Sequence, residues 1–173
     1  MGQEKFDEFK LKILKHVTDK WMEYKEYPPH LFFINENGGR KSLPLPMEGF
    51  HCPESKEALV AMIVDMLSII KAQMYCVTTE GWMVASKDGE AKLKDENGEF
   101  IRPSQHPDKQ EVLTFMFESI NGDSDMMTLL NNNGKLSPHN PGPEVGGEGG
   151  DIKLKGLFTG LLKKSRENDK NSE

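Results

Sequence analysis

The chain has 173 residues, an apolar content of 36 % and a net charge of −6, which suit one folded domain with an appendage. Residues 151–173 hold six Lys or Arg against four Asp or Glu, so they carry +2 and the remainder carries −8. A body of that charge repels a phosphate backbone, which argues against nucleic-acid binding and leaves an acidic mimic of nucleic acid as an alternative.

Two cysteines, Cys52 and Cys76, are too few for a disulfide framework. The sequence opens with charged residues and shows no apolar signal region. Its longest apolar stretch, around residues 58–70, is interrupted by Asp65 and Ser68 and is too short to span a bilayer. These features predict a cytoplasmic protein without a membrane partner.

The first predicted elements are a helix and a hairpin. Residues 4–25 place their apolar side chains on one helical face, and Pro28 and Pro29 end that helix. Residues 31–34 are a fully apolar run of strand type. Asn37 and Gly38 favour a hairpin turn into a returning strand over residues 40–45, and the prolines of this strand make it an edge strand.

The second half of the predicted domain is a helix followed by strands. Residues 55–73 are apolar nearly all round, which predicts a helix buried at the centre of the domain. Strands are expected over residues 74–85, 112–117 and 126–130, with a polar excursion over 87–110. The order predicts an α+β domain over residues 1–134, with a mainly antiparallel sheet of about five strands and two helices on one face.

The remainder of the chain is expected to be a tether and a helix. Residues 135–151 form a Gly/Pro-rich linker, residues 152–164 an amphipathic helix begun by Asp151, and residues 165–173 a disordered tail. We expect the apolar face of this helix to dock on a partner protein, on a second copy or on its own domain. The residues of that face are Leu154, Leu157, Phe158, Leu161 and Leu162.

One dense polar set lies around the excursion. If its two flanking strands are neighbours, Glu80 and His106 could approach as the acid–base pair of a hydrolase-like enzyme. The alternative, which we favour, is that Ser104 and Asp108 make turn hydrogen bonds and that Arg102 pairs with a carboxylate. As a test of the site, we expect Trp82 and Arg102 to lie close together, with Glu80 or Asp108 as the partner of Arg102. The other candidate polar residues are Trp82, Arg102, Ser104, Asp108 and Glu111.

The same residues carry a resemblance. Residues 79–83, Thr-Glu-Gly-Trp-Met, and residues 102–111, Arg-Pro-Ser-Gln-His-Pro-Asp-Lys-Gln-Glu, resemble the signature of an uncharacterised family from bacterial and phage genomes. That family has Glu-Ala-Trp at the end of one strand and Arg-Pro-Ser-x-His-Pro-Asp-Arg-x-Glu at the start of the next. The match covers roughly residues 30–130 and departs at Gly81 and Lys109. The resemblance implies a shared fold and no particular reaction.

Other chemistries lack their signatures. The histidines and cysteines are scattered without the paired spacing that holds a metal ion, and the glycines of residues 146–150 lack the Lys-Ser/Thr of a phosphate-binding loop. No nucleophile elbow occurs, and Cys76 sits in an apolar strand as a structural cysteine. We therefore expect no cofactor and no metal, and a small cytoplasmic, phage-associated interaction module that docks through its C-terminal helix.

Overall fold

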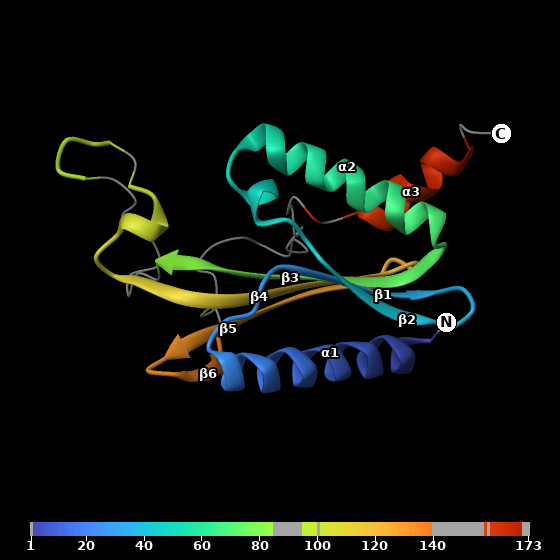
Figure 1. Cartoon of the computed structure of the whole chain (residues 1–173), viewed down its shortest axis with the longest axis horizontal. Helices are drawn as coiled ribbons and strands as arrows, with labels where there is room; N and C mark the ends of the chain where they lie inside the picture. The colour runs from blue at the N-terminus through green and yellow to red at the C-terminus, as the bar shows by residue number, and fades with distance from the viewer. Residues whose placement is uncertain (1, 85–94, 100, 140–157, 159, 171–173) are drawn as a thin grey trace, which may run out of the picture.

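The computed structural model describes residues 2–84, 95–99, 101–139, 158 and 160–170, and Figure 1 shows their arrangement. Two 3₁₀ turns, η1 (Met47–Phe50) and η2 (Pro103–Gln105), accompany the main elements. The main elements are α1 (Gln3–Tyr24), β1 (His30–Asn35), β2 (Arg40–Pro44), α2 (Pro53–Ile69), β3 (Ala72–Val84), β4 (Lys109–Ser119), β5 (Ser124–Asn132), β6 (Lys135–Pro138) and α3 (Leu161–Lys170).

The described strands form one antiparallel sheet in the order β2-β1-β3-β4-β5-β6. This confirms the predicted α+β class and the antiparallel sheet. The sixth strand was not predicted, because the run ending at Gly134 was interpreted as the end of the domain. Asn133 and Gly134 instead adopt left-handed backbone angles, with φ of 53° and 84°. Such angles make a tight hairpin turn, so the chain continues into β6.

The helices cover both faces of the sheet, with α1 on one side and α2 and α3 on the other (Figure 1). The prediction of two helices on one face is therefore wrong. The reason lies in β1, where Leu31, Phe32, Phe33 and Ile34 are all buried. Side chains alternate between faces along a strand, so a fully apolar strand needs cover on both sides.

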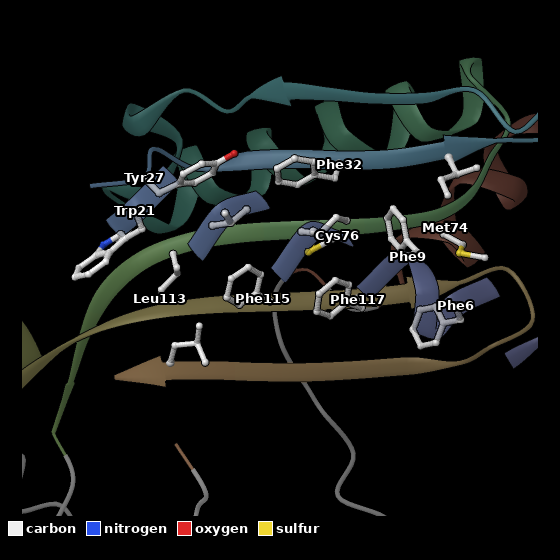
Figure 2. Packing of buried hydrophobic residues seen from close by; sticks show 14 residues of the cluster. Phe6, Phe9, Trp21, Tyr27, Phe32, Met74, Cys76, Leu113, Phe115 and Phe117 are labelled. Atoms are coloured by element: carbon white, nitrogen blue, oxygen red, sulfur yellow. The ribbon is translucent and has the colours of Figure 1, made fainter. Parts of the chain in front are cut away.

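The α1 side of the sheet holds the larger aromatic core. Phe9 of α1 meets Phe117 edge to face, with ring centroids 6.3 Å apart, and Phe115 stacks on Phe117 at 6.1 Å (Figure 2). The predicted helical face is confirmed here, since its aromatic and aliphatic side chains pack against β1, β3, β4 and β5. The residues of this face that are fully buried are Phe6, Phe9, Ile13, Val17 and Trp21.

The helix α2 is not the buried centre that its composition predicted. It packs one stripe against the sheet, formed by Leu59, Ile63, Val64 and Leu67. Its outer surface remains accessible, and Ile69 is 81 % exposed. A helix that is apolar all round is usually covered on every side. Within the described residues, however, no element covers the outer surface of α2.

The C-terminal helix begins later than its apolar spacing suggested. Gly160 has a φ of +70°, so the α-helix starts at Leu161 and runs through residues 165–170, which had been assigned to a disordered tail. Residues 152–157, the first half of the predicted helix, lie outside the described residues, as does Asp151. Among the helices described, none has both the length and the apolar character needed to cross a bilayer.

Candidate functional site

Glu80 and His106 are each held by local hydrogen bonds. Glu80 belongs to the α1 face of β3, where its Oε1 accepts a hydrogen bond of 2.6 Å from the backbone N–H of Tyr27. His106 follows η2, which contacts β3 and β4, and its Nδ1 accepts a hydrogen bond from the backbone N–H of Asp108. The acid–base pairing of Glu80 with His106 stays a prediction.

Glu80 instead joins the end of α1 to the sheet. Burial raises the pKa of its carboxyl group, and the nearby carboxylates of Glu111 and Glu26 raise it further. The backbone N–H of Tyr27 and the indole of Trp21 oppose this rise by donating hydrogen bonds to the charged form. The carboxylate therefore anchors the loop that follows α1.

The segment that precedes β4 is a compact turn. The N–H of Gln105 donates to the carbonyl of Arg102 at 2.8 Å, and the N–H of Asp108 donates to Nδ1 of His106 at 3.0 Å. The Nζ of Lys109 donates to the carbonyl of Ser104 at 2.8 Å. These contacts support the interpretation of this polar stretch as turn structure.

The cation that lies over Trp82 belongs to Lys109. Its Nζ is 4.7 Å from the centroid of the indole ring. Lys109 pairs with Val84, two positions along the ladder from Trp82, and a diagonal neighbour on the same face is within reach of a long side chain. Among the described residues, no ion pair joins Arg102 to Glu80 or Asp108, so the expected pairing of Arg102 is wrong.

Glu111 and the strand β5 complete this part of the sheet. The Nδ2 of Asn131 donates to Oε2 of Glu111 at 2.5 Å. That bond links β4 to β5, so Glu111 has a structural role in the sheet. Trp82 lies opposite Glu111 in the ladder, Lys109 contacts both Trp82 and Ser104, and Glu111 is close enough to Glu80 to raise its pKa, so these candidate residues are neighbours that make structural contacts.

The C-terminal helix docks on its own domain. Leu161 and Leu162 are 0 % and 3 % exposed within the cluster that α2 forms with β1 and β3. The ring of Phe158 lies 5.7 Å from that of Phe50. Phe158, Leu161 and Leu162 therefore dock in cis, on their own domain. The other two residues of the predicted partner-binding face, Leu154 and Leu157, lie outside the described residues.

Polar contacts hold the start of this helix. The hydroxyl of Tyr75 lies 2.6 Å from Oε2 of Glu118 and 2.6 Å from the carbonyl oxygen of Phe158. The N–H of Gly160 donates to the same Oε2 at 2.7 Å. Burial and the neighbouring Glu118 raise the pKa of Tyr75 far above its ordinary value, so the phenol keeps its proton and acts as a donor.

A groove of about 420 Å³ lies between α2 and α3. Its floor is apolar, with Val60, Ala61 and Val64 of α2, and its rim carries charged side chains from both helices. The sequence signal for it is the nearly all-round apolar character of residues 55–73, which predicts burial rather than a groove. The charged residues of the rim are Glu57, Asp65, Lys164 and Glu167.

The described part of the chain holds no candidate metal centre, and comparisons with known proteins give no relative. Within the described ranges, no three His, Cys, Asp or Glu side chains gather closely enough to hold a metal ion. A comparison of the chain with protein-family models, with curated proteins and with solved structures found no match in any of the three. The function therefore has to be argued from the surfaces themselves.

Proposed function

We propose that this protein is an interaction module whose partner docks on the outer surface of the helix pair α2–α3. The observation that carries the proposal is the apolar outer surface of α2, which no described element covers. Met62 is 38 % exposed and Ile69 is 81 % exposed on a helix whose composition favours burial on all sides. Exposed apolar surface with a polar rim is typical of protein-binding sites.

The charges at the groove indicate the chemistry of the partner. Three carboxylates and one ammonium group surround the apolar floor, and the whole chain carries a net charge of −6. A groove between two helices accepts an amphipathic helix in a common recognition mode. The proposed occupant is therefore a helical segment of another protein that presents apolar side chains flanked by Lys or Arg.

In this proposal α3 acts as one wall of the binding surface. Lys164 and Glu167 line the groove, while Leu161 and Leu162 fasten the helix to the domain. The C-terminal helix thus binds the partner through its outer side rather than through its apolar face. Association with phage proteins and a cytoplasmic location belong to the same proposal and rest on the resemblance and composition of the sequence.

A peptide selection tests the proposal. Random helical peptides would be displayed and selected against the full chain, and the dissociation constants of the selected sequences measured by calorimetry. We expect Lys- or Arg-rich amphipathic sequences, whose binding Ala61→Arg weakens at least tenfold, because that change places a cation in the groove. Gln3→Arg is the matched control, since it adds the same charge at an exposed residue of α1, on the other face of the sheet.

Two outcomes would overturn this function. One is a selection that yields no such sequences, or sequences that bind both variants as tightly as the unmodified chain. The other is a dimer in light scattering that Ala61→Arg dissociates and Gln3→Arg does not, because the occupant would then be a second copy.

A further inference from the structure

A second groove, on the opposite face of the sheet, lies between α1 and the β1–β2 hairpin. Its volume is about 450 Å³, and Phe9, Ile13 and Phe32 contribute apolar surface to it. A neighbouring cavity of about 310 Å³ shares His16 with it and continues toward Lys20. The helix α1 packs on β1, β3, β4 and β5, so the hairpin strand β2 lies beside this helix rather than beneath it.

The groove is cationic although the chain is acidic. Lys12 and Arg40 line it, and no carboxylate does. Lys41 also borders it, but this residue pairs with Phe33, which packs in the α2 core, so its side chain belongs to the other face of the sheet. Among the described residues, Glu8 is the one carboxylate within ion-pair distance of Lys12 or Arg40, so one acidic side chain balances part of two positive charges and the groove favours an anionic occupant.

The strand that borders this groove has a free edge. In the described sheet β2 pairs with β1 alone. Hydrogen-bonded and non-bonded pairs alternate along an antiparallel ladder. The N–H of Asn35 bonds to the carbonyl of Gly39 next to the turn, and the N–H of Leu45 bonds to the carbonyl of Pro29 at the other end.

The alternation between these two bonds determines which backbone groups face outward. Arg40 and Ser42 occupy the non-bonded positions opposite Ile34 and Phe32, so their N–H and C=O groups point away from β1. Their side chains share the face of Ile34 and Phe32, which pack in the α1 core. The free backbone groups and the cationic groove thus lie side by side along the same strand.

We propose that an acidic, extended peptide segment of a partner protein adds to the outer edge of β2 as a seventh strand. Its backbone would pair with Arg40 and Ser42, and its alternate carboxylate side chains would enter the groove beside Lys12 and Arg40. Strand addition at a sheet edge obtains affinity from main-chain hydrogen bonds and specificity from alternate side chains. This site is separate from the α2–α3 groove and binds the opposite charge.

A second copy of this chain is a poor occupant. Pairing two β2 strands edge to edge would bring Arg40 and Lys41 of one chain against those of the other, and directly opposed like charges destabilise a strand pair. Basic residues and Pro44 protect the edge against self-association, and the same basic residues attract an acidic strand. Charge therefore distinguishes the proposed partner from a homodimer.

The first experiment titrates the full chain with a defined probe. The acetylated and amidated peptide Thr-Glu-Val-Glu-Val-Glu-Thr would be compared with its Glu-to-Lys counterpart and with free glutamate at an equal carboxylate concentration. Binding would be followed by amide chemical shifts and by hydrogen exchange. We expect the acidic peptide to bind at least tenfold more tightly than the lysine peptide and to protect the amides of Arg40 and Ser42.

Protein variants separate the backbone contribution from the charge. Ser42→Pro deletes the outward N–H, which an edge strand tolerates, and should weaken binding at least tenfold, whereas Ser42→Ala keeps the N–H and should bind normally. Arg40→Glu should also weaken binding at least tenfold. Lys5→Glu makes the same change of net charge at an exposed α1 residue outside the groove and should have little effect.

Modified peptides test the proposal on the unmodified protein, in case Ser42→Pro disturbs the fold. Methylating the amide nitrogens of one alternate set of peptide residues should abolish binding to the unmodified chain, while methylating the other set should not. Equal binding by both methylated peptides, saturation of the same shifts by glutamate, or protection of amides remote from β2 would overturn the strand-addition site.

Discussion

Tyr75 on β3 and Glu118 on β4 lie directly opposite each other in the sheet, with the phenol oxygen 2.6 Å from the carboxylate. The same two groups bind the backbone of the C-terminal segment at Phe158 and Gly160. One cross-strand pair therefore connects the centre of the sheet to a segment that follows it by about forty residues in the chain. The position of α3 depends on this pair and on the apolar contacts of Leu161 and Leu162.

Removal of the Tyr75 hydroxyl should loosen α3. The single hydroxyl proton of Tyr75 is shared between the carboxylate of Glu118 and the carbonyl of Phe158, and Tyr75→Phe removes that donor, so we expect a loss of about 1–3 kcal/mol in the free energy of unfolding. Urea unfolding and hydrogen exchange of residues 158–170 would measure it. Tyr24→Phe, at a residue that is 59 % exposed, is the control. Unchanged exchange in the Tyr75 variant would contradict the anchoring role.

Truncation of Leu161 tests the apolar part of the same docking. This side chain is fully buried, so Leu161→Ala should lower the free energy of unfolding by about 2–5 kcal/mol. Lys163→Ala, at an exposed position of the same helix, should change it by no more than about 0.5 kcal/mol. Similar unfolding midpoints for the two variants would mean that α3 is not packed as the structure shows.

Glu80 should make stability depend on pH. Its pKa is raised in the folded chain, chiefly by burial. The folded state then binds more protons than the unfolded state between the two pKa values, so this group favours folding more as the pH falls. Glu80→Gln keeps an acceptor for the N–H of Tyr27 but cannot titrate.

Urea unfolding of both proteins at several pH values from 7 down to about 4, a range that reaches the ordinary pKa of a glutamate, would measure this effect. Relative to Glu80→Gln, the unmodified protein should gain stability as the pH falls through this range. Stability curves that run parallel over this range would show that Glu80 does not carry the shifted pKa.

The two cysteines should differ in reactivity. Cys76 is fully buried, and burial raises the pKa of its thiol, whereas Cys52 is exposed before α2. Only the thiolate reacts with aromatic disulfide reagents. The native chain should therefore release one equivalent of reporter rapidly and the denatured chain two, and Cys52→Ser should remove the rapid phase. Rapid reaction of two thiols in the native chain would contradict the packing around β3.

The sequence by itself determined the local elements and several of the turns between them. The spacing from Phe6 to Trp21 predicts α1 with its buried face, although the helix ends at a left-handed Lys25 before the prolines, and Asn37-Gly38 predicts the turn between β1 and β2. These features depend on backbone conformation and on side chains a few residues apart. Class and antiparallel pairing follow from the order of such elements, which explains why they could be predicted.

Only the tertiary structure decided how the faces are matched. Periodicity shows which residues share a face of an element, but the element that covers this face is chosen by packing across the whole chain. For that reason α1 and α2 lie on opposite sides of the sheet, and α2 keeps an accessible apolar surface that its sequence suggested was buried. The pairing of Glu80 with His106 depends in the same way on how the segment before β4 approaches β3, which no local pattern specifies.

The contact between Tyr75 and Glu118 arises from the register of β3 with β4, and the docking of α3 adds residues that are more than eighty positions from Tyr75. No local pattern distinguishes Tyr75 or Glu118 from other strand residues, because their contact exists only once the strands are paired. The apolar stripe around Leu161 determined that the tail would dock somewhere. The α2 side of the sheet offers an apolar surface for this stripe, beside the Tyr75 hydroxyl and the Glu118 carboxylate, which hydrogen-bond to residues 158 and 160. Docking in cis therefore buries the apolar stripe and also satisfies these polar groups.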